Sequence, residues 1–77
     1  MTLPVEQAFG QVIREYRTQR GWSQEYLSEQ SHLDRTFISH VERGTKIPSL
    51  LTIVQLAHSF NVSAADLMQA MEDKITQ

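Results

Sequence analysis

The chain has 77 residues and a formal net charge of −2. Domains that bind nucleic acid are usually strongly basic, so any such binding here would depend on a local excess of positive charge. This length predicts one domain, and the absence of cysteine excludes disulfides and cysteine-containing zinc sites, which favours the cytoplasm. The first residues lack the basic and apolar regions of a secretory signal, and no apolar run approaches the roughly 20 residues that span a membrane.

Apolar residues at helical spacing predict the first helix, over about residues 4–20. Four of them recur at i, i+3, i+4 and i+7, as on one buried helix face: Phe9, Val12, Ile13 and Tyr16. Pro4 suits the first turn, and Gly21 stands where helices commonly end in the left-handed conformation. Arg17 and Arg20 suit the negative end of the helix dipole.

Two short helices joined by a tight turn are predicted next, over about residues 24–30 and 35–43. Ser23 and Asp34 are good N-cap residues, because their side-chain oxygens accept hydrogen bonds from the free backbone N–H groups of the first turn. His32 lies in the turn between the helices. Histidine is tolerable there if the turn needs a positive φ angle.

The rest of the chain predicts two further helices, over about residues 50–60 and 64–73. Ser49 and Ser63 can cap their N-termini, and Asn61 suits a left-handed residue between them. No stretch alternates with period two for long enough to predict a strand. The fold class is therefore all-α, with five helices.

The helix over residues 35–43 has two unlike faces. On a helical wheel Phe37, Ile38 and Val41 form the side expected to be buried. Five polar side chains are centred about 180° away: Arg35, Thr36, Ser39, His40 and Arg43. From residue 35 to 46 three basic side chains stand against the single acidic Glu42. We expect this helix to enter a DNA major groove, with the planar fork of Arg35 reading the two acceptors of a guanine.

The ordered motifs resemble the Cro/C1-type helix-turn-helix family. Four segments carry the resemblance, in this order: Ser-Gln-Glu-Tyr-Leu at 23–27, Leu-Asp-Arg-Thr-Phe-Ile-Ser at 33–39, Val-Glu-Arg-Gly at 41–44 and Pro-Ser-Leu-Leu-Thr-Ile at 48–53. The similarity covers about residues 9–67. It implies a five-helix, lambda-repressor-like DNA-binding domain over residues 1–77, with residues 23–43 as the helix-turn-helix unit.

The resemblance also implies roles for individual residues. Base contacts are expected at the start of the second helix of the unit, from Arg35, Thr36 and Ser39. Contacts to DNA phosphates are expected from the start of the first helix, the end of the second and the loop after it: Gln24, Arg43, Thr45 and Lys46. His40 is expected to face solvent or to lie near a phosphate.

Three residues depart from the family pattern or leave it open. Many relatives have glycine where His32 and Asn61 stand. Phe37 is expected in the core, and the alternative is that it approaches the DNA backbone. The short chain and the motif at 33–39 also resemble the controller proteins of restriction–modification systems, which are small homodimers that bind operators, although phage-type repressors and antitoxins share much of the pattern.

The helix over residues 50–60 is apolar over an arc of roughly 220°, which is wider than one core usually needs. Leu51 and Val54, with Met68 and Met71 of the last helix, predict a self-complementary patch between two subunits. We therefore expect a homodimer on a palindromic operator in double-stranded DNA. The alternative is that these residues only complete a loosely wrapped core.

Other functions have weaker support in the sequence. The histidines share no metal-ligand spacing, so we expect no metal and no other cofactor, and a chain this short leaves little room for a catalytic pocket. No ligand-binding segment follows the helices, so no small-molecule ligand is expected. Glu42 is expected to hold Arg35 or a neighbouring arginine in position, and Trp22 to pack on Tyr26 or Leu27. The competing function is an antitoxin or another protein-interaction module that uses the same fold.

Overall fold

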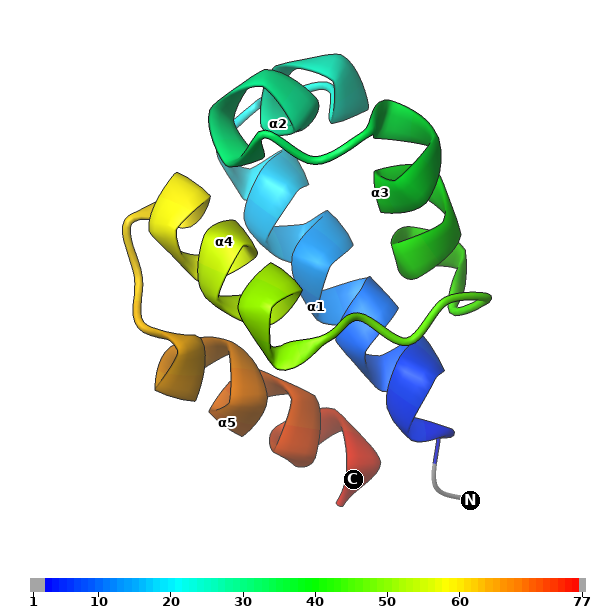
Figure 1. The fold of residues 1–77 in the computed structure, drawn as a ribbon. Coiled ribbons are helices and arrows are strands. Elements are labelled where there is room, and N and C mark those ends of the chain that lie inside the picture. The colour runs from blue at the N-terminus through cyan, green and yellow to red at the C-terminus, as the bar shows by residue number, and fades with distance from the viewer. Residues whose placement is uncertain (1–2, 77) are drawn as a thin grey trace.

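Five helices make up residues 3–76, which are the residues that this computed structural model describes, and that part of the chain contains no strand (Figure 1). The elements follow one another as α1 (Val5–Gln19), α2 (Gln24–Ser31), α3 (Arg35–Arg43), α4 (Leu50–Phe60) and α5 (Ala64–Ile75). The prediction of an all-α fold is confirmed. The last helix ends at Ile75 and not near residue 73, because the Lys74 ammonium bonds the Glu15 carboxylate of α1 at 2.7 Å and Ile75 packs against the core.

Side-chain caps begin four of the helices, as their sequences predict. The hydroxyl of Ser23 accepts from the backbone N–H of Tyr26 at 3.0 Å, and a carboxylate oxygen of Asp34 accepts from that of Thr36 at 3.0 Å. Ser49 caps α4 in the same way, and Ser63 shares a reciprocal capping box with the third residue of α5. These caps fix where each helix starts, which sets the direction of the chain on either side of α3.

His32 and Asn61 adopt left-handed backbone angles, with φ of 61° and 59°. Both follow the last residue of a helix, α2 and α4 respectively. The left-handed conformation is therefore adopted here without glycine, at the small steric cost that histidine and asparagine bear better than most residues.

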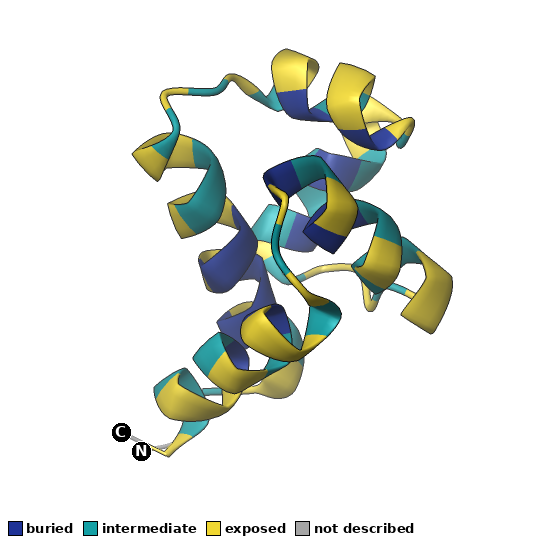
Figure 2. Cartoon of the chain, turned by 90° about the vertical axis from the view of Figure 1, so that its left-hand side faces the viewer, coloured by how far each residue is buried: buried dark blue, intermediate teal, exposed yellow. Residues whose placement is uncertain are grey.

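Helix α1 runs through the middle of the molecule and packs against both α3 and α5 (Figure 1). The start of α1 and the end of α5 lie at the same end of the fold, and α2 crosses the other end. Figure 2 shows that the buried residues face inward from all five helices. They form one core: Ala8, Phe9, Val12, Ile13, Leu27, Ile38, Val41, Leu56, Ala57, Phe60, Leu67 and Met71. This core holds the inner side of α3 against α1.

Met71 departs from its expected place on a surface patch between subunits. Only 7% of its surface is exposed, because α5 lies along α1 and turns residue 71 inward, one helical turn after the fully buried Leu67. Met68, on the preceding turn, is half-buried and packs against the core from outside. The side chain of Met71 therefore stabilises the monomer and is not part of the surface.

Candidate nucleic-acid interface

Helix α3 divides into a packed side and an open side, as its sequence predicts. Ile38 and Val41 are buried, whereas Arg35 and Thr36 are exposed and Ser39 is half-buried. Within residues 3–76 the side chains of Arg35, Thr36 and Ser39 make no hydrogen bond or ion pair with the rest of the protein. Their donors and acceptors are therefore available to a molecule that approaches α3 from outside.

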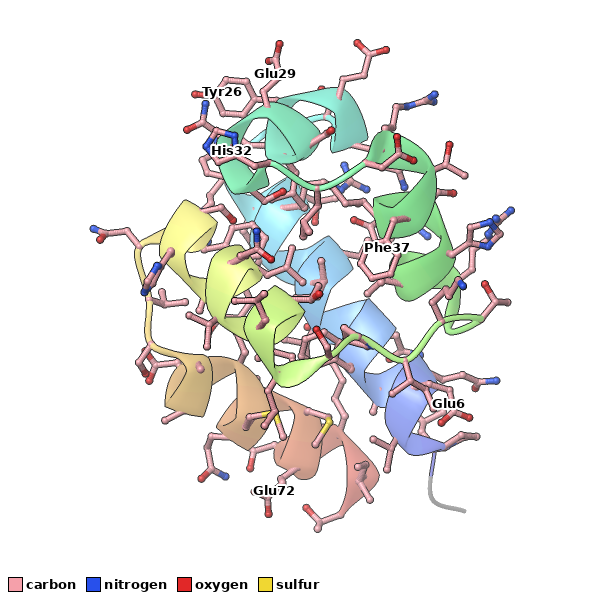
Figure 3. All side chains as sticks on the ribbon, in the orientation of Figure 1. Glu6, Tyr26, Glu29, His32, Phe37 and Glu72 are labelled. Atoms are coloured by element: carbon pink, nitrogen blue, oxygen red, sulfur yellow. The ribbon has the colours of Figure 1, made fainter. Side chains whose placement is uncertain are left out.

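Phe37 lies at the border of these two sides. It is half-buried and packs against the core, and Figure 3 shows its ring turned from α3 toward the middle of the molecule. The structure thus agrees with the expectation that Phe37 belongs with the packed residues. Trp22 also packs as expected, with its ring centroid 4.9 Å from that of Tyr26, which lies in the first turn of α2.

At the end of α3 and in the following loop, His40 lies together with two of the predicted phosphate contacts, Arg43 and Thr45. The hydroxyl of Thr45 lies 3.0 Å from His40 Nδ1 and also donates to the His40 carbonyl, while Arg43 Nη2 lies 3.2 Å from the same ring nitrogen. His40 Nδ1 therefore lies within hydrogen-bond distance of both Thr45 and Arg43. Lys46 follows directly and is exposed. This cluster offers several N–H donors to an anion.

Glu42 lies on the inner side of the same helix end and holds an arginine, but the arginine is Arg17 of α1, not Arg35. Arg17 Nε donates to Glu42 Oε2 at 2.7 Å and Arg17 Nη2 to Oε1 at 2.9 Å. The third guanidinium nitrogen, Nη1, donates to the Trp22 carbonyl at 2.8 Å. The hydrogen bond to Glu42 raises the pKa of Arg17 above its ordinary value, although burial opposes this. The ion pair therefore favours the charged form of the Arg17 guanidinium.

Gln24, the predicted phosphate contact at the start of α2, belongs to the same group of residues. Its Nε2 donates to Glu42 Oε1 at 3.1 Å, and the side chain is half-buried. The structure thus places Gln24 beside the end of α3. Its amide is anchored before any ligand binds.

Exposed apolar side chains gather where α4 begins. Ile47, Leu50 and Leu51 are 76%, 81% and 70% exposed, and Val54 is 39% exposed one turn later. We call these four residues the α4 patch. Leu51 and Val54 lie where the sequence predicts an interface, whereas Ile47 was missed because it lies in the loop, where no helical wheel applies. Its apolar character beside three apolar positions of α4 is the signal that points to it.

Other kinds of site have no counterpart in residues 3–76. This part of the molecule contains no pocket and no group of three or more side chains placed to hold a metal ion. None of its helices has the length and apolar character needed to cross a membrane.

The five helices, with an open polar side on the second helix of a tightly joined pair, define a helix-turn-helix domain. A family model described as helix-turn-helix matches residues 13–67, and the chain belongs to this family. Its relatives include control proteins and an HTH-type transcriptional regulator. The chain is accordingly a DNA-binding regulator and not an enzyme.

Several relatives are controller proteins of restriction–modification systems. The control protein C.BamHI of Bacillus amyloliquefaciens is 38% identical over 69 residues, which cover 88% of this chain and 85% of that protein. The crystal structure of the controller protein C.AhdI from Aeromonas hydrophila is 42% identical, with a TM-score of 0.78 over 80% of this chain and 94% of the other. A third similar structure is that of the C.Esp1396I tetramer in complex with its natural 35 base-pair operator. Its protein chain is 26% identical, with a TM-score of 0.86 over 95% of this chain and 96% of the other.

Proposed function

We propose that this regulator binds a two-fold symmetric operator as a homodimer and acts as a controller protein of the kind found in restriction–modification systems. The observation that carries the proposal is the open side of α3, where Arg35, Thr36 and Ser39 have no hydrogen-bond partner within the described residues while Ile38 and Val41 anchor the opposite side. The similarity to C.BamHI and C.AhdI supports the controller subclass. Because the operator lies on DNA in the cytoplasm, we also propose that the protein is located there.

In this proposal α3 lies in the major groove. Arg35, at its first turn, reads a guanine through two parallel hydrogen bonds, and the hydroxyl groups of Thr36 and Ser39 meet neighbouring base edges. The surrounding donors hold the phosphates on either side of the groove: Gln24, His40, Arg43, Thr45 and Lys46. Phosphate contacts fix the register of the protein on the duplex, and the base contacts supply sequence preference.

The homodimer forms through the α4 patch. Monomeric proteins rarely leave contiguous apolar side chains this exposed, and a two-fold contact would cover the patch with its own copy. A two-fold pair can place two α3 helices about 34 Å apart, which is one turn of DNA, and so doubles a short recognition sequence into a palindrome. The competing function, an antitoxin or adaptor, would use the same patch for a different protein.

Selection from random duplex DNA at low salt tests this function. We expect an enriched motif with two-fold symmetry, bound by two chains per site as measured by the mass of the complex. Affinity should fall steeply as salt rises, because phosphate contacts release counterions. Selection that enriches no motif contradicts the proposal. Purification from the host in a fixed ratio with an unrelated protein, without a homodimer, supports the adaptor function instead.

A further inference from the structure

Glu42 joins three helices around one carboxylate. It lies near the end of α3, its side chain is only 4% exposed, and it accepts hydrogen bonds from Arg17 of α1 and from Gln24, the first residue of α2. These are the polar partners of the Glu42 side chain within residues 3–76. The core packing of α3 does not require a carboxylate at this place, since Ile38 and Val41 already fill the inner side of the helix.

The chemistry of these partners determines how the Gln24 amide is oriented. A carboxylate only accepts hydrogen bonds, so the amide nitrogen of Gln24, and not its oxygen, must face Glu42. The nitrogen uses one hydrogen on Glu42 Oε1 and keeps the second for another acceptor. A DNA phosphate also only accepts, so this second N–H is the group with which Gln24 can bind it.

Arg17 offsets the negative charge of the Glu42 carboxylate, which would otherwise repel a phosphate bound at Gln24. Its guanidinium binds both oxygens of Glu42 at 2.7 and 2.9 Å, which neutralises the carboxylate and fixes its plane. Arg17 is itself held by the Trp22 carbonyl at 2.8 Å, two residues before Gln24. The start of α2 is thus tied to the end of α3 through charged hydrogen bonds that are shielded from water.

We propose that Glu42 is a positioning residue for DNA binding, which fixes the side-chain amide of Gln24 so that one N–H is directed to a phosphate without Glu42 itself touching DNA. The proposal rests on the proposed function. Its physical advantage is that the ordering of a flexible glutamine is completed during folding, so the entropy of fixing the side chain does not weaken binding.

The substitution Glu42→Gln tests the proposal because two effects of opposite sign compete. Loss of a negative charge near the duplex, taken alone, strengthens binding to any DNA. Loss of positioning weakens it, because the new amide has one oxygen where the carboxylate had two and cannot serve both Arg17 and Gln24. We expect affinity to fall about three- to tenfold, equivalent to one net hydrogen bond, on operator and random duplex alike. The matched control Glu25→Gln makes the same charge change at an exposed neighbour of Gln24 and should not weaken binding.

A double-mutant cycle with Gln24→Ala separates positioning from a general effect on the fold. We expect Gln24→Ala to weaken binding by a similar factor without changing the salt dependence, since glutamine is uncharged. In that background Glu42→Gln should cause no further loss. Equal losses in both backgrounds, or stronger binding by Glu42→Gln alone, would overturn the proposal. If Gln24→Ala has no effect while Arg35→Ala weakens operator binding, the positioning role fails and the proposed function stands.

A measurement on the unaltered protein covers the case in which Glu42→Gln does not fold. Side-chain relaxation by NMR reports the order of each glutamine amide in the free protein. We expect the Gln24 amide to be ordered before DNA is added, in contrast to that of the exposed Gln30, which has no hydrogen-bond partner in the described part of the chain. A Gln24 amide as mobile as that of Gln30 would overturn the proposal.

Discussion

Gly10 of α1 packs directly against the carbonyl oxygen of Val41 in α3, so the backbones of the two helices come close together at this point. A β-carbon at residue 10 would overlap that oxygen and would also stand 2.8 Å from the carbonyl oxygen of Glu42. Both oxygens belong to backbone, which cannot turn aside as a flexible side chain can. The last turn of α3, and with it the position of the proposed DNA-binding side, therefore depends on a glycine in α1.

Gly10→Ala should destabilise the protein by about 1–3 kcal/mol, because the added methyl group forces α1 and α3 apart and this cost exceeds the better helix propensity of alanine. Urea denaturation measures the change. The control Gln11→Ala, at the exposed neighbouring position, should leave stability unchanged or slightly higher. A Gly10→Ala protein as stable as the unaltered chain would show that the helices can separate without cost.

Arg35→Ala should weaken operator binding by about 1–3 kcal/mol and relax the preference at one base position, since Arg35 is proposed to read a base. Lys46→Ala should weaken all sequences about equally and lower the slope of log affinity against log salt by about 1, since a lone phosphate contact is lost. Fluorescence anisotropy titrations on operator and random duplex over a salt series measure both. Equal losses on the two duplexes for Arg35→Ala would contradict base readout.

Leu51→Asp should convert the proposed dimer to a monomer while leaving the fold intact. Leu51 is 70% exposed in the monomer, so aspartate should change the free energy of unfolding by no more than about 0.5 kcal/mol. A charge buried in the dimer interface should raise the dimer dissociation constant by at least about tenfold. Sedimentation equilibrium over a concentration series measures the dissociation constant. Gln19→Glu adds a single negative charge at an exposed site in α1 and should not change it.

Arg20→Lys should destabilise the protein by about 1–2 kcal/mol even though the positive charge is kept. The guanidinium donates to the carbonyls of Tyr16 and Phe60 at 3.1 and 2.9 Å, and lies 5.3 and 5.1 Å from the centroids of the same two rings. An ammonium cannot make both hydrogen bonds and stack. The exposed Arg14 is the control, and thermal denaturation of Arg14→Lys should match that of the unaltered chain. Equal melting temperatures for both lysine variants would show that the hydrogen bonds and ring contacts of the Arg20 guanidinium do not stabilise the fold.

The helices and their caps could be predicted from the sequence because their signals are local. A serine or aspartate before an apolar period acts within one turn, so Ser23 and Asp34 indicate helix starts without any knowledge of the fold. The two faces of α3 follow in the same way from the spacing of Ile38 and Val41. The open side of the proposed interface could therefore be read from nine consecutive residues.

The contacts that hold the site in place could not be predicted, because they join distant parts of the chain. Arg17 and Glu42 are 25 residues apart, and the dipole of α1 alone already accounts for a basic residue at the end of that helix. Met71 has the spacing of a surface residue only if α5 is taken alone, and its burial follows from the packing of α5 on α1. The close approach at Gly10 likewise depends on where α3 lies.

The division of α3 into an inner side that packs and an outer side without internal contacts has a consequence for the way such regulators diverge. Arg35, Thr36 and Ser39 contribute little to folding, so exchanging them should retarget the protein to a new DNA sequence with almost no loss of stability. A duplicated gene could thus acquire its own operator through a few changes on one turn and a half of helix, while its scaffold is inherited unaltered.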